Sequence, residues 1–381
     1  MKRTIFTPDH EDFRQTAREF LAKEVVPRFP DWEAAGLVPR EIFGKIGELG
    51  VLGIQIPEEF GGGGSSSFLY SAIWAEETAR ACVNLGGLSV HLNVVLPYFL
   101  TYCSEEQRRR WFPRLAGGDL MTAIAMTEPG TGSDLAGMAT TAEHRGGHYV
   151  LSGAKTFITG GINADLVVVV ARTSKGANRR DGLSLLVVER NMPGFTQGRN
   201  LDKIGLKTQD TAELFFEDVK VPAENLLGEE GKAFTYLTSN LPQERLGIAV
   251  GAQAAAEAAL ATTLEYVRSR KVFGATVSSF QNTKFELAAC ATDIEAGRAL
   301  VDRALAAHEA GELSVADAAK VKVFCTELQA RVVDRCLQLY GGYGYMWEYP
   351  IARLYADARV SRIYGGTTEV LKTIIAKSLG L

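Results

Sequence analysis

The apolar pattern of this chain changes from helical to strand-like and back to helical, and that order constrains the fold more than any single motif. Over residues 7–116, apolar side chains such as Phe13, Ala17 and Phe20 recur at helical spacing, which indicates amphipathic helices. Over residues 121–228, short β-branched runs alternate with clusters of Gly, Asn and Asp, which is typical of an all-β sandwich or barrel. From residue 231 the helical period returns in long segments joined by short turns, which favours an antiparallel four-helix bundle.

These regimes predict an α+β fold with an N-terminal α-helical domain (residues 1–120), a middle β-barrel or β-sandwich domain (residues 121–230) and a C-terminal four-helix bundle (residues 231–381). The bundle helices are predicted over residues 241–268, 280–310, 315–340 and 367–379, and the clearest strands over residues 148–152, 166–171, 183–188 and 213–216. Four consecutive glycines at 61–64, followed by three serines, predict a flexible link between two N-terminal helices.

The composition excludes several classes of protein. The net charge is −4 and no block of like charge is longer than residues 108–110, whereas a nucleic-acid or membrane-surface protein needs a concentrated basic face. The longest aliphatic run, residues 166–171, is too short to cross a bilayer,. Five cysteines without a C-x-x-C pair and five scattered histidines indicate reduced thiols and no metal site. We expect a cytoplasmic protein that binds neither nucleic acid nor membrane.

A loop rich in glycine and hydroxyl groups lies where the helical region gives way to strands. Gly130 and Gly132 flank a threonine, and Thr127 and Ser133 add further hydroxyls. Glycine allows a close approach to the backbone, so the free amides of such a loop can bind an anion or the polar edge of a ring. A simple turn with an Asx-type bond from Asp134 explains the same residues equally well.

Two further glycine clusters lie in the C-terminal region. Residues 338–345, from Gln338 to Tyr345, end a predicted helix, and the cluster alone indicates a glycine C-cap with an aromatic contact. Gly365 and Gly366 precede Thr367, which can cap the last helix. Exposed amides at a helix start suit a phosphate or a carbonyl group.

Glu244 and Arg245 are predicted to lie in the first turn of the helix over residues 241–268. A carboxylate beside an arginine in a first turn is usually a solvated pair that complements the helix dipole. The residues that follow are almost all apolar or small, which indicates early burial. Gly247 and Gly251 leave a strip without side chains, which serves either a ligand or close helix packing.

Taken in order, five segments resemble the acyl-CoA dehydrogenase family, and the resemblance covers essentially the whole chain. They are Thr127-Glu128-Pro129-Gly130-Thr131-Gly132-Ser133-Asp134, Gly153-Ala154-Lys155-Thr156-Phe157-Ile158-Thr159, Arg270-Lys271-Val272-Phe273-Gly274 with Gln281, Gln338-Leu339-Tyr340-Gly341-Gly342-Tyr343-Gly344-Tyr345, and Ile363-Tyr364-Gly365-Gly366-Thr367-Thr368-Glu369. Each segment alone is weak evidence, but the probability that all five agree in order by chance is very small.

The resemblance implies that FAD is the cofactor. It assigns the flavin ring and its surroundings to Met126, Thr127, Gly132, Ser133, Phe157, Ile158 and Thr159. It assigns the adenine and pyrophosphate, partly across a subunit interface, to Arg270, Phe273, Gln281, Gln338, Gly341 and Gly342. Thr367 and Glu369 are also expected beside FAD. Many relatives have tryptophan at the Phe157 position, and phenylalanine retains an aromatic plane for stacking.

Gly365 is the informative departure from the family pattern, because many members have their catalytic glutamate at this position. Here the chain resembles the long-chain and isovaleryl branches, whose base comes from the helix that contains Glu244, and its motifs are most similar to the long-chain branch. We therefore expect Glu244 to be the catalytic base. Ser133, Arg245, Gly365 and Gly366 are the expected substrate-binding residues. Ala356 replaces the arginine that usually precedes Asp357, which puts that local ion pair in doubt.

The implied reaction is α,β-desaturation of a medium-chain, long-chain or branched fatty acyl-CoA, as in fatty-acid β-oxidation. An electron-transfer flavoprotein is the implied electron acceptor, and the implied assembly is a homodimer or homotetramer. Three alternatives remain open: a flavin oxidase or monooxygenase of the same fold, a dehydrogenase acting on carrier-protein thioesters, and a non-catalytic assembly subunit.

Overall fold

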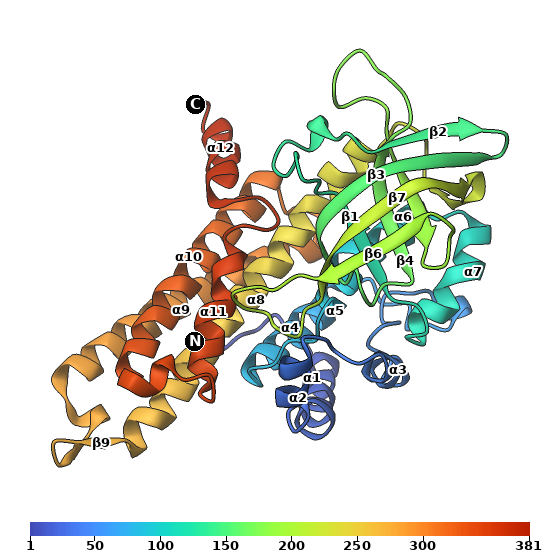
Figure 1. The fold of residues 1–381 in the computed structure, drawn as a ribbon. Coiled ribbons are helices and arrows are strands. Elements are labelled where there is room, and N and C mark those ends of the chain that lie inside the picture. The colour runs from blue at the N-terminus through green and yellow to red at the C-terminus, as the bar shows by residue number, and fades with distance from the viewer.

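The computed structural model describes residues 1–381 and confirms the α+β fold, in which an N-terminal helical region, a β-sheet domain and a C-terminal bundle follow one another along the chain (Figure 1). The N-terminal region contains π-helical turns at Leu21–Val25 and His91–Val95. Its α-helices are α1 (Pro8–Phe20), α2 (Phe29–Ala35), α3 (Glu41–Glu48), α4 (Leu69–Arg80), α5 (Leu88–Val90), α6 (Leu96–Tyr102) and α7 (Glu105–Ala116).

The middle domain is an eight-stranded sheet that folds into two facing halves. Its strands are β1 (Thr122–Ala125), β2 (Thr141–Arg145), β3 (His148–Thr159), β4 (Leu166–Arg172), β5 (Leu183–Glu189), β6 (Phe195–Asn200), β7 (Thr211–Pro222) and β8 (Leu226–Leu227). The strand order is β6-β7-β3-β2-β4-β5-β8, with β1 parallel to β4. A single residue pair, Thr141 with Arg172, joins β2 to β4.

Strand β4 is buried on both faces, which explains why its sequence is continuously aliphatic. Val167 and Val169 face residues of β3 and β7 between the two halves of the sheet. Val168 and Val170 belong to a second core that includes Phe99 of α6 and residues of α7. Burial on both faces removes the alternation that a half-exposed strand shows.

The C-terminal region contains α8 (Ala233–Ser269), α9 (Gln281–Glu309), α10 (Val315–Tyr340), α11 (Pro350–Ser361) and α12 (Thr368–Ser378), with a small hairpin of β9 (Lys271–Val272) and β10 (Ala275–Thr276) between α8 and α9. The four predicted segments are present, and Ser314 caps α10 by accepting a bond from the amide of Asp317. Helix α11 was not predicted. It is short and lies between two glycine clusters that interrupt the apolar pattern.

The predicted start of α8 was wrong, and this changes the position of Glu244. The helix begins at Ala233, and Pro242 lies in its interior. Proline is more common at the first helical position, which is why the sequence indicated a start at residue 241. Glu244 therefore lies about three turns into α8. It is not a first-turn carboxylate that complements the helix dipole.

The predicted flexible link at 61–64 was also wrong. The amide of Gly63 donates to Gly53 O at 2.9 Å, and the amide of Gly64 donates to Ile56 O at 2.8 Å. A Cβ at Gly62 would overlap the carbonyl of Ile56. These glycines allow two backbone segments to approach closely, and the run is hydrogen-bonded structure.

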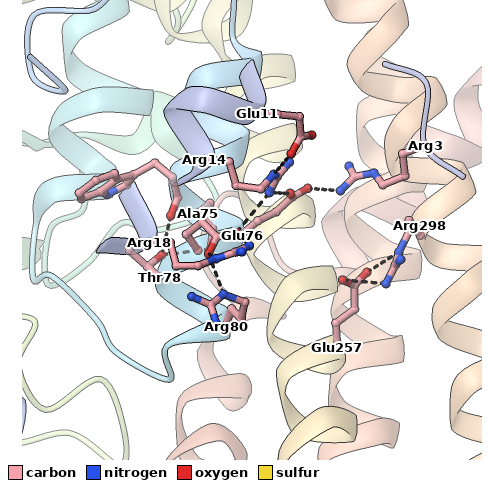
Figure 2. Close-up of polar contacts among 12 residues, drawn as sticks. Arg3, Glu11, Arg14, Arg18, Ala75, Glu76, Thr78, Arg80, Glu257 and Arg298 are labelled. Carbon is pink, nitrogen blue, oxygen red and sulfur yellow. Dashed lines mark hydrogen bonds and ion pairs between the residues drawn. The ribbon is translucent and has the colours of Figure 1, made fainter. Parts of the chain in front are cut away.

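An ion-pair network attaches the N-terminal segment and α1 to α4 (Figure 2) and, through Arg3, to α9. Arg3 binds Glu76 of α4 at 2.7 Å and Asp302 of α9 at 2.6 Å. Glu77 is only 2% exposed. Its carboxylate lies within hydrogen-bond distance of three guanidinium groups, those of Arg14, Arg18 and Arg80. Because α4 and α8 also share an apolar core, the network fixes the environment of α8. None of the helices combines the length and apolar character needed to span a membrane.

Candidate active site

The carboxylate of Glu244 is buried where α6 contacts α8, and the residue is 6% exposed. Tyr98 Oη donates a hydrogen bond to Oε1 at 3.1 Å, and Asn240 Nδ2 donates to the same oxygen at 3.1 Å. Burial raises the pKa of Glu244 to about 7, while these two bonds and the nearby charge of Arg245 oppose the increase. No hydrogen bond reaches Oε2, so this oxygen can accept a proton from a ligand.

The turn at Gly365 packs against the part of α8 that carries Glu244. Gly365 and Gly366 have positive φ angles of 67° and 97°. A Cβ at Gly365 would overlap Ile248 Cδ1, one turn after Glu244. Arg245 Nε donates to Gly365 O at 3.3 Å. The structure therefore brings Glu244, Arg245, Gly365 and Gly366 together, and Ile248 occupies the space beside Gly365.

The backbone amides of residues 365–367 make no hydrogen bond within the chain. Thr367 caps α12, since its Oγ1 accepts a bond from the amide of Val370 at 3.3 Å, as predicted. Glu369 is exposed in the first turn of α12. Three free amides before a helix start form a donor site for an oxygen atom of a ligand.

A buried ion pair fixes the loop that follows β1. Lys155 of β3 binds Glu128 at 2.8 Å and also donates to Met126 O at 3.1 Å. Glu128 in turn accepts bonds from the amides of Ala139 and Thr140. Burial lowers the pKa of Lys155 against the opposing effect of Glu128. This pair was not predicted, because only the fold brings the two side chains together.

The loop is open on the side of its glycines. A Cβ at Gly130 or Gly132 would meet no atom within 4 Å, so space for a ligand remains there. The side chain of Asp134 makes no hydrogen bond to the backbone, so the Asx-type turn considered from the sequence is not formed. Its carboxylate lies 3.6 Å from Arg179. The amide of Thr156 donates to Thr127 O at 2.9 Å, which connects the loop to β3.

Phe157 projects from β3 because the strand is irregular at this point. The pairing of β3 with β7 shifts between Lys155 and Ile158, and Phe157 has a φ of 59°. Phe157 is 67% exposed, whereas Ile158 is buried. Thr159 Oγ1 accepts a bond from Gln209 Nε2 at 3.2 Å. A large aromatic side chain held outward at positive φ is strained and usually has a functional reason.

A cationic hollow of about 430 Å³ lies between the segment after Ser133 and the loop that joins β4 to β5. Three cationic side chains, those of Arg172, Lys175 and Arg179, contribute to its lining. Arg172 also donates to the carbonyls of Ala136 and Arg179, which connects its two sides. No motif marks this hollow, because Lys175 and Arg179 lie in an exposed loop of ordinary composition and Arg172 is the last residue of β4.

The remaining predicted cofactor residues lie at the other end of the bundle. Figure 1 shows the β9–β10 hairpin at the end of α8 that is remote from the sheet. This distal group contains Arg270, Phe273, Gln281, Gln338, Gly341 and Gly342, and all six residues are exposed. Phe273 is 98% exposed, and the guanidinium of Arg270 lies 4.9 Å from the ring centre of Tyr343. Within one chain this group does not meet the residues around Phe157.

Asp357, whose usual arginine neighbour is replaced, is partly buried and accepts a hydrogen bond from the amide of Leu206. Burial raises its pKa to about 6. A backbone donor therefore binds this carboxylate in place of the missing ion pair.

Comparison with known proteins agrees with this organisation. The N-terminal, middle and C-terminal domain models of acyl-CoA dehydrogenase match residues 7–119, 123–219 and 231–380. The mitochondrial long-chain specific acyl-CoA dehydrogenase of Sus scrofa is 48% identical, over 99% of this chain and 88% of the relative.

Two solved structures extend the comparison. The crystal structure of an acyl-CoA dehydrogenase from Geobacillus kaustophilus superimposes with a TM-score of 0.97 at 49% identity, over 100% of both chains. A glutaryl-CoA dehydrogenase from Mycobacterium smegmatis, in complex with FADH2, gives a TM-score of 0.90 at 30% identity, over 98% of this chain and 95% of that chain. The chain belongs to the acyl-CoA dehydrogenase family of flavin-dependent oxidoreductases.

Proposed function

We propose that this protein is an FAD-dependent acyl-CoA dehydrogenase that uses Glu244 to remove the α-proton of a fatty acyl thioester. The main observation is a buried carboxylate, with a pKa raised to about 7, beside a glycine turn that has no side chain of its own. An α C–H is weakly acidic, so the reaction needs both a base and stabilisation of the developing enolate.

The arrangement around Glu244 supports its role as a base at neutral pH. A general base works best when its pKa is near the operating pH, and burial brings the pKa of Glu244 into that range. Tyr98 and Asn240 orient the carboxylate through Oε1. This leaves Oε2 for the proton, and the free amide of Gly365 for the thioester oxygen.

The residues of the middle domain fit FAD. When bound, FAD supplies the electron acceptor for the hydrogen that leaves the β-carbon. Phe157 offers an exposed aromatic plane, Thr159 offers a hydroxyl, and the loop carrying Met126, Thr127, Gly132 and Ser133 offers open backbone. The relative from Mycobacterium smegmatis that was crystallised with FADH2 supports this assignment.

The cationic hollow favours CoA over a carrier protein as the thioester partner. CoA carries a diphosphate and a 3′-phosphate, and the arginines and lysine of the hollow suit such groups. Arg179 of the hollow lies 3.6 Å from Asp134, the residue after Ser133, so a nucleotide there can continue into the flavin loop. The 48% identity to a long-chain specific enzyme supports a fatty acyl chain in the medium to long range.

The distal group supports assembly as a homodimer or homotetramer. Arg270, Phe273, Gln281 and Gln338 are exposed and remote from Phe157 in one chain, so a second copy is needed to bring them to the adenine and pyrophosphate of FAD. Sedimentation of the FAD-loaded protein tests the assembly, and a monomer with normal FAD affinity would contradict it.

An electron-transfer flavoprotein is the proposed acceptor of the electrons that the flavin takes from the substrate.

The decisive experiment compares Glu244→Gln with Glu257→Gln, a matched control on the same helix whose carboxylate pairs with Arg298 at 2.9 Å. Both variants should bind yellow flavin. Under anaerobic conditions an acyl-CoA should bleach the parent and the Glu257 variant, but not the Glu244 variant. Normal bleaching of Glu244→Gln would refute the assignment of the base.

The same preparation separates the alternatives. A colourless protein that gains no flavin from added FAD would favour a non-catalytic assembly subunit. Hydrogen peroxide formed in air at the rate of substrate loss would favour an oxidase. Faster turnover of a carrier-bound acyl group than of its CoA ester would favour a carrier-protein dehydrogenase.

A further inference from the structure

Lys322 of α10 is a fully buried lysine without a carboxylate partner. The residue is 0% exposed and forms no ion pair within the described chain, residues 1–381. Isolated buried charges are costly and persist only where other groups bind them or where they have a function. Burial, with a smaller effect from the nearby charge of Arg245, lowers the pKa of Lys322 to about 8. Two cations therefore lie close together without an anion that neutralises Lys322.

The ammonium group of Lys322 binds the backbone of the glycine turn. Nζ donates to Tyr364 O at 2.6 Å and to Gly366 O at 2.6 Å. Arg245 Nε donates to the carbonyl between them, Gly365 O, at 3.3 Å. Cations on α10 and α8 thus hold three consecutive carbonyl groups. We call this arrangement the carbonyl clamp.

The carbonyl clamp determines how the amides of the turn are presented. With all three carbonyl oxygens bound, the amides of residues 365 and 366 are left without an internal acceptor. A cation at the oxygen end of a peptide group also polarises its N–H end, which makes the amide a better donor to a negative oxygen. Ile248 also packs against the turn at Gly365.

We infer that Lys322 is a positioning residue for enolate stabilisation, because it holds the Tyr364–Gly366 turn so that the Gly365 amide donates to the thioester oxygen. The inference rests on the proposed function, since it requires a thioester at this turn. Negative charge on that oxygen develops only as the α-proton leaves for Glu244. Loss of the clamp should therefore slow proton removal more than it weakens binding of the substrate.

The test uses an acyl-CoA analogue in which sulfur replaces the β-carbon. Such a molecule has no β-hydrogen to transfer, so its only reaction is loss of the α-proton to the base. The pH at which the bound analogue ionises, followed through the visible absorbance of the FAD-loaded enzyme, reports enolate stabilisation separately from oxidation. The variants are Lys322→Gln and Lys322→Arg. Lys320→Met is the control, because Lys320 is exposed on the same helix and pairs with Asp317 at 3.0 Å.

We expect Lys322→Gln to reduce kcat on the order of 100-fold, with KM changed much less, and to raise the pH at which the analogue ionises. The Lys320 control should match the parent. Ionisation of the analogue by a folded, FAD-loaded Lys322→Gln at the parent's pH would overturn the inference. If the glutamine variant does not retain FAD, Lys322→Arg decides. A planar guanidinium cannot reproduce both short bonds of an ammonium group, so its kcat should also decrease, and an unchanged kcat would overturn the inference.

This outcome is independent of the identity of the base. If the Lys322 variants shift the ionisation of the analogue while Glu244→Gln still bleaches normally, the turn stabilises the enolate but the proposed base is wrong. If Glu244→Gln is inactive and the Lys322 variants behave like the parent, the assignment of Glu244 as the base is supported and the inference about Lys322 is wrong.

Discussion

Arg245 donates a hydrogen bond to the carbonyl of Gly365 at 3.3 Å, although 120 residues separate them in the sequence. The bond connects the helix that carries Glu244 to the turn where many family members carry their own glutamate. Glu244 of α8, the proposed base, and the turn between α11 and α12 therefore keep a fixed relation.

The first prediction concerns Gly365→Ala. The new methyl group would overlap Ile248, and alanine is strained at a φ of 67°. We expect a loss of about 1–3 kcal/mol in the free energy of unfolding, with a clear decrease in kcat. Gly251→Ala is the control, since a Cβ there meets no atom within 4 Å. Thermal unfolding and steady-state rates of both variants give the comparison, and equal stability of the two would contradict the described packing.

The second prediction concerns the acid limb of the pH–rate profile. With a pKa of about 7, Glu244 is protonated below neutrality and cannot act as a base, so kcat/KM should rise with pH through this region. The Tyr98 bond lowers the pKa of Glu244, as do the bond from Asn240 and the charge of Arg245. Tyr98→Phe should therefore move the limb to higher pH and lower the rate at pH 6 by about threefold or more.

Tyr102→Phe is the matched control, because Tyr102 lies one turn later on α6 and stacks on Tyr236. Its profile should coincide with that of the parent. The raised pKa of Glu244 in the folded protein also has a consequence for stability. A carboxyl whose pKa is raised by folding contributes stability that is fully present below its unfolded pKa of 4.5 and is lost as the pH rises through about 7,. An acid limb in Tyr98→Phe at the parent's position or below would contradict the assignment.

The third prediction concerns the ion-pair network of Figure 2. Folding lowers the pKa of Glu77: burial alone would raise it, but the bonds from Arg18 and Arg80 outweigh that effect. The stability it contributes should thus be present above its unfolded pKa of 4.5 and be lost as the pH falls through the lower folded pKa. Glu77→Gln should cost about 2 kcal/mol at pH 7 and little at low pH. Thermal unfolding at several pH values measures this, with the exposed Glu143→Gln as control.

The sequence predicted the elements whose period is unbroken, and it was wrong where local and tertiary effects compete. The bounds of α10 and β4 agree with the predicted ranges to within a residue. The start of α8 was misplaced because Pro242, a common first residue of helices, lies inside this one. The motifs predict functional roles for the segments around Thr127, Phe157 and Gly365.

The partners within the candidate site could not be predicted in the same way. Lys322 and Lys155 are buried and bind backbone carbonyls or a carboxylate far away in sequence. The available signal for Lys322 was its position between two valines, Val321 and Val323. It indicates a buried cation but not what that cation binds, because the pairing depends on the packing of α10 against the turn at Gly365.

The last prediction concerns the cationic hollow. If Lys175 and Arg179 bind phosphates of CoA, the double variant Lys175→Ala with Arg179→Ala should raise KM for an acyl-CoA by roughly tenfold at low ionic strength, and added salt should reduce the difference. KM for the same acyl group on pantetheine, which has no phosphate, should not change. Arg145→Ala is the control, because Arg145 is exposed on β2 and pairs with Glu143 at 2.6 Å. An equal increase of KM for both thioesters would mean that the loop acts on the acyl or pantetheine part. No increase for either would mean that the nucleotide binds elsewhere.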